Sequence, residues 1–251
     1  MELGLADRVY LDTGGARGLG RATADVLVAE GARVVLSGRT EETLAAAVEE
    51  LGERTAYVVG DNADPDLPRR LIVTARETWG RIDGALVSVG GPPTGTVSAT
   101  TDEQWTTAFG AVFLGAVRVA REVAAELGDG GSLAFVLSTS VRAPLPAMAV
   151  SNGLRPGLAM VAKQLADELG PRGIRVNGLL PGRIGTERVA ELDAMQEDPE
   201  AARAAALEKI PLGRYGEPSE FGRAAAFLLS PAASFVSGAL LPVDGGALRA
   251  L

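Results

Sequence analysis

Residues 9–20 decide the fold, and they read VYLDTGGARGLG. The apolar run over residues 9–12 predicts a buried strand, and Gly14, Gly18 and Gly20 follow it before a segment of helical periodicity. Glycine permits positive φ angles and close backbone approach, and a helix N-terminus presents unpaired N–H groups to a pyrophosphate. Strand, turn and helix together predict a dinucleotide-binding βαβ unit, the alternative being a turn with a purely structural role.

The rest of the chain repeats this alternation of short apolar runs and longer helical segments. The runs do not alternate apolar with polar residues, as is typical of parallel strands covered by helices on both faces. The sequence therefore predicts an α/β fold, a doubly wound seven-stranded parallel sheet (Rossmann fold) in a single domain over residues 1–251. The expected strands are residues 9–12, 34–37, 56–59, 85–89, 133–137, 176–180 and 240–243.

Composition excludes several classes of chemistry. None of the 251 residues is Cys or His, which removes disulfides, thiolate nucleophiles and imidazole catalysis, and we expect no metal site. The formal net charge of -8 argues against a nucleic-acid partner. Residues 1–8 show no signal peptide, and no apolar run approaches the about 20 residues that span a bilayer. We expect a cytoplasmic protein without a membrane partner, whose chemistry rests on hydroxyls, carboxylates, Arg, Lys or a cofactor.

Two arginines predict which nicotinamide cofactor is bound. After the second expected strand the chain reads Ser37-Gly38-Arg39, where an NAD site would place a carboxylate on the ribose 2′-OH. Gly38 offers no carboxylate, whereas Arg39 offers a guanidinium suited to the 2′-phosphate of NADP(H). Arg17, on the glycine turn, is placed to close the other side of that phosphate. The alternative is that both arginines are ordinary solvated surface residues.

One segment interrupts the regular alternation. Residues 186–210 are rich in Glu and Ala and helical in pattern, and Pro211 follows them. The segment is too polar for the core, and it follows the carboxyl end of a strand, where doubly wound folds bind ligands. We interpret residues 186–212 as a substrate lid. A solvated helical excursion is the alternative interpretation.

Further motifs carry a family resemblance. They are residues 61–62 (DN), 173–177 (GIRVN), 181–182 (PG), Thr186, 211–214 (PLGR), 216–218 (GEP) and 243–246 (VDGG). With the glycine turn, they make the chain resemble the short-chain dehydrogenase/reductase family, close to its 3-oxoacyl-carrier-protein reductase-like branch, nearly from end to end. The resemblance and the two arginines together imply an NADP(H) site formed by Thr13, Gly14, Ala16, Arg17, Gly18, Leu19, Gly20, Arg39, Asp61, Asn62, Gly90, Arg155, Pro181, Gly182 and Thr186.

The family's catalytic tetrad of Asn, Ser, Tyr and Lys is changed here. Counting from neighbouring motifs places the Tyr position on Ser151, the Lys position on Arg155 and the Asn position on Val112. The family's serine falls on Ser138, or on Ser140 if the intervening loop is shorter. A serine hydroxyl is far less acidic than a phenol, and arginine stays cationic, so Ser138, Ser151 and Arg155 would polarise a carbonyl while water supplies the proton.

The local sequence complicates that site. Ser151 and Arg155 share a helical face only if the helix has already begun at residue 151. Pro156 follows directly, and proline suits the first position of a helix better than its interior. One hypothesis is therefore that the helix begins near Pro156 and leaves Ser151 outside it. Asp12, where an apolar strand residue is expected, has no explanation from the sequence.

These observations leave three functions to weigh. The first is an NADP(H)-dependent oxidoreductase that transfers hydride between the nicotinamide and a small carbonyl or alcohol substrate, as in 3-oxoacyl reduction. The second is a weak or inactive NADP(H)-binding homologue that serves as a scaffold or partner subunit. The third is an enzyme that uses this fold without net redox chemistry. Residues 105–127 and 158–169 are apolar over wide faces. In the family the equivalent helices form dimer and tetramer interfaces, so the resemblance implies a homodimer or homotetramer. The alternative is that these faces only face the core.

Overall fold

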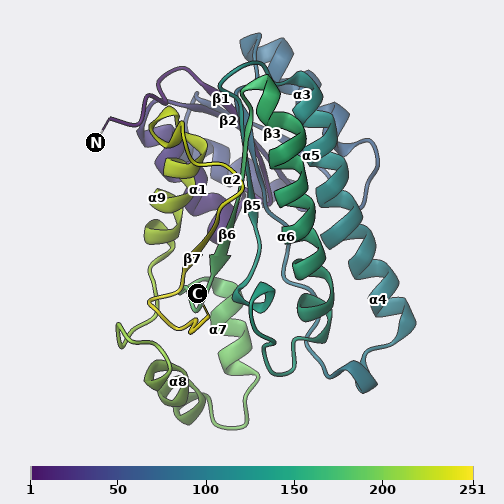
Figure 1. Ribbon diagram of the computed structural model, residues 1–251, viewed down its shortest axis with the longest axis vertical. Coiled ribbons are helices and arrows are strands. Elements are labelled where there is room, and N and C mark those ends of the chain that lie inside the picture. The colour runs from purple at the N-terminus through teal and green to yellow at the C-terminus, as the bar shows by residue number, and fades with distance from the viewer. Residues whose placement is uncertain (1, 251) are drawn as a thin grey trace.

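The computed structural model describes residues 2–250 and confirms the doubly wound sheet (Figure 1). Seven parallel strands lie in the order β3-β2-β1-β4-β5-β6-β7. All seven expected strands are present, with ends that differ from the expectation by one or two residues. Their bounds are β1 Val9–Thr13, β2 Arg33–Gly38, β3 Thr55–Val59, β4 Gly84–Val87, β5 Ser132–Val136, β6 Arg175–Pro181 and β7 Leu240–Val243.

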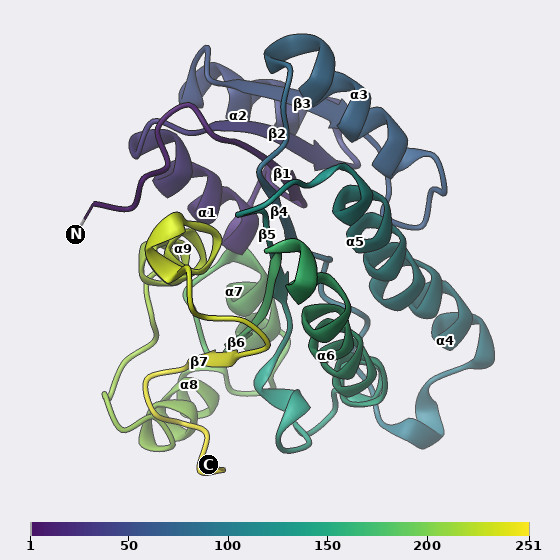
Figure 2. The ribbon, with the colours of Figure 1, turned by 45° about the horizontal axis from the view of Figure 1, so that its top comes forward.

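Helices cover both faces of the sheet, and each face has its own apolar core (Figure 2). One core lies under α3, α5 and α6, and the other lies under α1, α2 and α9, which explains why the strands are apolar on both faces. The helices are α1 Gly18–Ala29, α2 Glu41–Leu51, α3 Leu67–Trp79, α4 Asp102–Ala108, α5 Gly115–Glu126, α6 Ala149–Leu169, α7 Glu187–Ala194, α8 Pro199–Glu208 and α9 Pro218–Leu229.

Short helical segments join these elements. The 3-10 turns are η1 Val97–Ala99, η3 Thr139–Val141, η4 Gly170–Arg172 and η5 Pro231–Ala233. A π-helical segment, η2 Phe109–Leu114, connects α4 to α5, so the long helix expected over residues 105–127 changes its winding in the middle. π-helical turns are rare and are frequently found at functional sites.

The strand order places a crevice beside the glycine turn. β1 pairs with β2 on one side and with β4 on the other, so successive connections leave this point in opposite directions. Ligands of doubly wound folds bind at this topological switch point, outside the carboxyl ends of the strands. The turn at residues 14–17 therefore occupies the position where the architecture provides a binding site.

The hypothesis that a helix begins at Pro156 is wrong. α6 runs without interruption from Ala149 to Leu169, with Pro156 in its interior. A proline there costs about 3 kcal/mol in a free helix. Here the first turns of α6 are held by other contacts: the Asn152 side chain makes hydrogen bonds of 3.0 and 2.8 Å to the backbone N–H and C=O of Leu145. Ser151 and Arg155, which precede the proline on the same helix, are buried, so these first turns of α6 are also held by packing.

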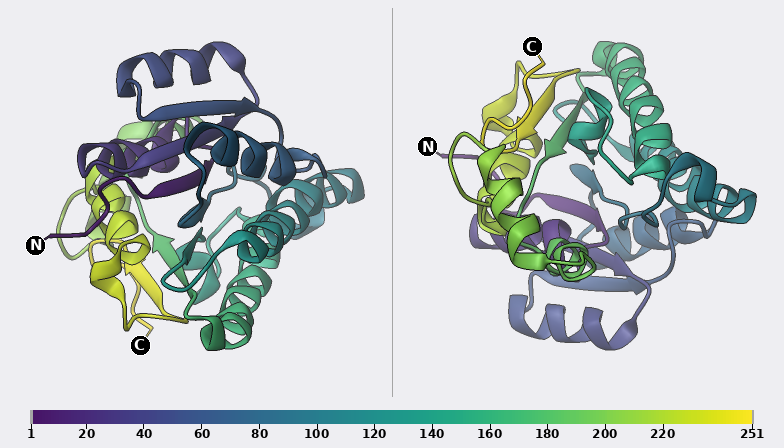
Figure 3. Two further views of the ribbon diagram at one scale, coloured as in Figure 1. Left: turned by 90° about the horizontal axis from the view of Figure 1, so that it is seen from above. Right: turned by 90° about the horizontal axis from the view of Figure 1, so that it is seen from below.

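The segment after β6 forms two helices beyond the carboxyl edge of the sheet (Figure 3). α7 and α8 contain no fully buried residue, in agreement with the expectation that this polar, helical segment lies outside the core. The backbone of Gly185 and of Gly216 fixes its base, because the Gly185 N–H donates to the Gly216 carbonyl at 2.8 Å. In the described part of the chain, no helix combines the length and the apolar character that a membrane crossing requires.

Candidate functional site

The glycine turn has the backbone geometry that close approach of a ligand requires. Gly14 and Gly18 have positive φ angles of 73° and 57°. A Cβ on Gly20 would lie 2.5 Å from the Gly14 carbonyl oxygen, so no larger residue fits there without a shift of the backbone. α1 begins at Gly18, and the Arg17 side chain that precedes it does not cap the helix. The first N–H groups of α1 therefore remain available to an anion.

A hydrogen-bond network joins the strand ends around this turn. The Thr13 hydroxyl donates to the Ser88 carbonyl at 2.6 Å and accepts from the Ser88 N–H at 2.9 Å. The Asn62 side-chain amide donates to the same carbonyl at 3.1 Å. The polar groups of Thr13 and Asn62 thus hold together the carboxyl ends of β1, β3 and β4. Ser88 was not among the residues singled out from the sequence, because only the tertiary fold brings it to Thr13.

The two arginines expected at the 2′-phosphate lie at neighbouring strand ends. Arg39 follows β2 and is exposed, and Arg17 lies on the turn that follows β1, the strand hydrogen-bonded to β2. The Arg17 guanidinium pairs with the Glu187 carboxylate, with 3.6 Å between Nη1 and Oε2. Glu187 is the first residue of α7, so an acidic side chain from the segment at 186–212 contacts the nucleotide turn.

The other residues expected at the cofactor are distributed around the same edge. Asp61 lies after β3 and uses a carboxylate oxygen to accept from the Ala63 N–H at 2.8 Å. Gly90 is exposed in the loop after β4, and Pro181 ends β6, with Gly182 next to it. Thr186 caps α7, its hydroxyl accepting from the Val189 N–H at 3.4 Å. Ala16 and Leu19, the last of this set, are half-buried beside the glycines.

The serines expected at the catalytic position divide into two roles. Ser140 faces Ser151, with 3.2 Å between their hydroxyl oxygens, and both residues are buried. Ser138 instead caps η3, its hydroxyl accepting from the Ser140 N–H at 3.1 Å. The geometry therefore pairs Ser151 with Ser140, the alternative that the sequence had left open, and gives Ser138 a contact within its own turn.

Arg155 lies one helical turn after Ser151 and is only 6% exposed. Its Nη1 donates to the Val136 carbonyl, at the end of β5, at 2.6 Å. No ion pair among residues 2–250 includes Arg155. Burial lowers the pKa of the guanidinium to about 10, which still leaves it cationic at neutral pH. The site thus contains a buried positive charge, whose hydrogen bond within the described residues goes to a backbone carbonyl.

Val112 and Asp12 are the remaining unusual positions. Val112 lies in η2, is 4% exposed and packs into the core under α3, α5 and α6, where it contributes no polar group. Asp12, in β1, is fully buried, and both of its carboxylate oxygens lack a hydrogen-bond partner within the described chain. Desolvation raises the pKa of Asp12 well above its ordinary value. A Cβ on Gly20 would lie 3.1 Å from one of these oxygens, so Asp12 lies directly behind the glycine turn.

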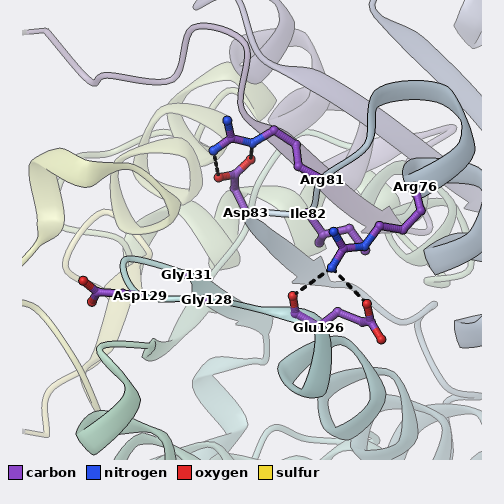
Figure 4. Close-up of a pocket in the computed structure, with 8 residues that line it drawn as sticks. All are labelled: Arg76, Arg81, Ile82, Asp83, Glu126, Gly128, Asp129 and Gly131. Atoms are coloured by element: carbon purple, nitrogen blue, oxygen red, sulfur yellow. Dashed lines mark hydrogen bonds and ion pairs between the residues drawn. The ribbon is translucent and has the colours of Figure 1, made fainter.

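Two cavities lie away from the serines and Arg155. The first, of about 250 Å³, is at the opposite end of the sheet, where β4 and β5 begin (Figure 4). Four of its charged side chains pair with one another: Arg76 contacts Glu126 at 3.0 Å and Arg81 contacts Asp83 at 2.7 Å. The second, of about 480 Å³, lies between Leu212 and the end of β7. Among residues 2–250, no group of three or more acidic side chains is placed to hold a metal ion.

Comparison with known proteins extends over nearly the whole chain. The family described as Enoyl-(Acyl carrier protein) reductase matches residues 14–247. An A-factor type gamma-butyrolactone 1'-reductase (1S-forming) from Streptomyces virginiae is 36% identical over 252 residues, which cover 96% of this chain and 96% of that protein. L-sorbose reductase from Gluconobacter frateurii, solved complexed with NADPH and L-sorbose, superposes with a TM-score of 0.91 at 29% identity over 100% of both chains.

A further solved structure is similar to the same extent. It is the apo form of a short chain oxidoreductase from Pseudomonas aeruginosa PAO1 that contains an atypical catalytic center. The two chains superpose with a TM-score of 0.91 at 30% identity, over 99% of this chain and 100% of the other. One solved structure to which this chain is similar is thus described as having an atypical catalytic center.

Proposed function

This chain belongs to the short-chain dehydrogenase/reductase family, an oxidoreductase family, and on that premise we propose that it transfers hydride between NADP(H) and a carbonyl or alcohol group of a small molecule. The observation that carries the proposal is the glycine turn with its uncapped helix N-terminus, flanked by Arg17 and Arg39. The dipole and free N–H groups of α1 favour a pyrophosphate, and two guanidiniums favour a 2′-phosphate. The NADPH complex of the related L-sorbose reductase supports this choice of cofactor.

The space beside the glycine turn and the network beneath it also fit the cofactor. A side chain at Gly20 would fill the space next to the Gly14 carbonyl, and Gly14 itself is exposed at the crevice. The network of Thr13, Ser88 and Asn62 holds three strand ends rigid beneath that crevice. When bound, the nicotinamide supplies or accepts the hydride. The chain's own residues then have to orient the carbonyl and stabilise the charge that develops on its oxygen.

We assign that task to Ser140, Ser151 and Arg155. The two hydroxyls are 3.2 Å apart and can each donate a hydrogen bond to a carbonyl oxygen placed beside them. Arg155 adds a buried permanent charge, and such a charge stabilises a developing oxyanion more strongly than an exposed one would. Since counting from the family motifs places Ser151 at the Tyr position, the proton that completes an alcohol comes from water in this proposal. Ser138, the other expected serine, supports this arrangement by fixing the turn that presents Ser140.

The family match also bears on the class of substrate. We propose a 3-oxoacyl-type carbonyl; the match to the family described as Enoyl-(Acyl carrier protein) reductase supports the acyl part of this proposal, and the 3-oxo group rests on the sequence resemblance. Residues 186–212 serve as the substrate lid in this proposal, since α7 begins against the glycine turn and has no buried residue. The exposed apolar side chains Phe109, Leu114 and Met160 support association of two or four copies through η2 and α6.

A second candidate function is an NADP(H)-binding homologue with little or no activity. Val112, which is apolar and buried, favours it because the site then lacks one polar group. The Arg155 contact to Val136 also favours it, since one guanidinium nitrogen is committed to the backbone.

One experiment separates the two candidates. NADPH and NADH are titrated against the protein while the fluorescence of Trp105 and Trp79 is recorded, and NADPH oxidation is then followed with ketones and 3-oxoacyl thioesters. Binding with turnover supports the enzyme, and tight NADPH binding without turnover on the whole panel supports the inactive homologue. Absence of binding for both nucleotides would overturn the cofactor assignment. Arg39→Asp is expected to shift the preference from NADPH towards NADH, and an unchanged preference would contradict the role of Arg39.

A further inference from the structure

The first turn of α7 contacts both sides of the nucleotide crevice. On the side of β1, Glu187 pairs with Arg17 at 3.6 Å, and the Thr186 methyl group lies 3.8 Å from the position of a Cβ on Gly18. On the side of β4, the Arg188 Nη2 donates to the Pro92 carbonyl at 3.2 Å. Three consecutive residues of one segment therefore span the crevice from the glycine turn to the loop after β4.

Binding of the nucleotide must change the pairing of Arg17 with Glu187. Arg17 is one of the two cations assigned to the 2′-phosphate, yet in the free protein its nearest anion is the Glu187 carboxylate. A phosphate monoester carries close to two negative charges at neutral pH, more than a carboxylate. Arg17 can shift to the phosphate, but the Glu187 carboxylate is then left unpaired next to a polyanionic ligand. The repulsion is specific to the cofactor form that recruits Arg17.

We propose that Glu187 is a selectivity residue of the cofactor site, which holds Arg17 in the free protein and competes with the 2′-phosphate of NADP(H) for it. The inference rests on the proposed function, because it assumes that NADP(H) occupies the crevice. Glu187 lowers the affinity for the phosphorylated cofactor and leaves the affinity for NADH nearly unchanged. The relative affinity for the two cofactors is therefore set by a residue of α7 as well as by the arginines after β1 and β2.

The expected size of the effect follows from the exposure of the pair. The side chains of Arg17 and Glu187 are 60% and 68% exposed, so water and salt weaken their attraction. Exposed ion pairs of this kind correspond to a change of about 1.5- to 5-fold in an equilibrium constant. Glu187→Gln is expected to lower the Kd for NADPH by about that factor and to change the Kd for NADH by less. The Gln side chain keeps the size of Glu and removes only the charge.

The test uses the whole chain, calorimetric titration with NADPH and with NADH, and a matched control. Glu200→Gln removes the same charge from the first turn of α8 without changing the pair with Arg17, so its Kd ratio should equal that of the wild type. In an Arg17→Gln background, Glu187→Gln should no longer improve the NADPH affinity, because the cation for which Glu187 and the phosphate compete is gone.

Each outcome decides a different point. An unchanged or higher Kd ratio of NADPH to NADH in Glu187→Gln overturns this proposal, even if the wild type binds NADPH well. An equal gain in the Arg17→Gln background overturns the competition for Arg17 as its cause, and so does an equal gain in Glu200→Gln. If the wild type binds neither nucleotide, the proposed function fails and this inference falls with it.

Discussion

Replacement of Asp12 by valine should stabilise this protein, although the change lies directly behind the glycine turn. Asp12 is fully buried on the face of β1 that it shares with Tyr10, and its register partners Leu36 and Leu86 are apolar. Neither carboxylate oxygen has a hydrogen-bond partner in the described chain. An unpaired buried polar group costs about 1–3 kcal/mol, and valine removes that cost while it keeps a comparable volume.

The effect should also depend on pH, with a defined sign. Burial raises the pKa of Asp12 in the folded protein, whereas in the unfolded chain the pKa is about 3.9. Above that value the unfolded chain releases the proton and the folded protein keeps it, so the wild type loses stability as pH rises towards the folded pKa. The loss is about 1.4 kcal/mol for each pH unit in that window. The advantage of Asp12→Val should therefore grow as pH rises above the unfolded pKa and level off above the raised folded pKa.

Urea unfolding at several pH values directly measures the difference in the free energy of unfolding between the wild type and Asp12→Val. For a chain of this size, about 1–3 kcal/mol corresponds to an increase in Tm of about 2–10 °C. Asp12→Asn is the matched control, because it keeps an unpaired polar group but cannot titrate. In Asp12→Asn the free energy of unfolding should lose the pH dependence that Asp12 causes, but it should keep the pH-independent cost of an unpaired buried polar group. Parallel stability curves for wild type and Asp12→Val across this pH range, or a less stable Asp12→Val, would refute the reasoning.

Three further predictions concern the turn, α6 and the serines. Gly20→Ala forces a Cβ to within 2.5 Å of the Gly14 carbonyl, so we expect NADPH affinity to fall at least tenfold in a titration, while an unchanged Kd would show that the turn tolerates a side chain. Pro156→Ala should raise the free energy of unfolding by up to about 3 kcal/mol in urea denaturation, and a loss of stability would mean that the proline fits this helix. Ser151→Ala removes the hydroxyl that faces Ser140, so turnover should fall with little change in the Kd for NADPH; retained turnover would exclude Ser151 from the reaction.

The sequence predicted the sheet because its signal is local. Each strand is a continuous apolar run, and burial between two helical layers requires that pattern of every central strand. The start of α6 was mispredicted because its position is not set locally. The preference of Pro156 is local, but the contacts between Asn152 and Leu145 outweigh it. Those contacts depend on how the preceding loop folds back. The π-helical winding at residues 109–114 likewise has no periodic signature in the sequence.

The candidate site was only partly predictable. Counting from neighbouring motifs placed the Tyr and Lys positions on Ser151 and Arg155, and the structure finds both residues on α6, although the preference of Pro156 suggested a later helix start. Spacing could not decide between Ser138 and Ser140, because the answer depends on which hydroxyl the turn η3 directs towards α6. The contact between Arg17 and Glu187 joins residues 170 positions apart in the printed sequence, and nothing in either local sequence indicates it.

The packing of α1 against α9 has a consequence for the order in which the molecule is assembled. Gly222 lies so close to α1 that a Cβ there would be 2.2 Å from the Ala22 carbonyl oxygen, and this contact covers the helix that begins at the glycine turn. α1 is therefore covered by α9, which lies about 200 residues later in the chain. A nascent chain that lacks α9 leaves the apolar face of α1 exposed to water and to chaperones. The part of the chain before α9 is thus not a separable nucleotide-binding module, and its capacity to bind should emerge only after α9 has been synthesised.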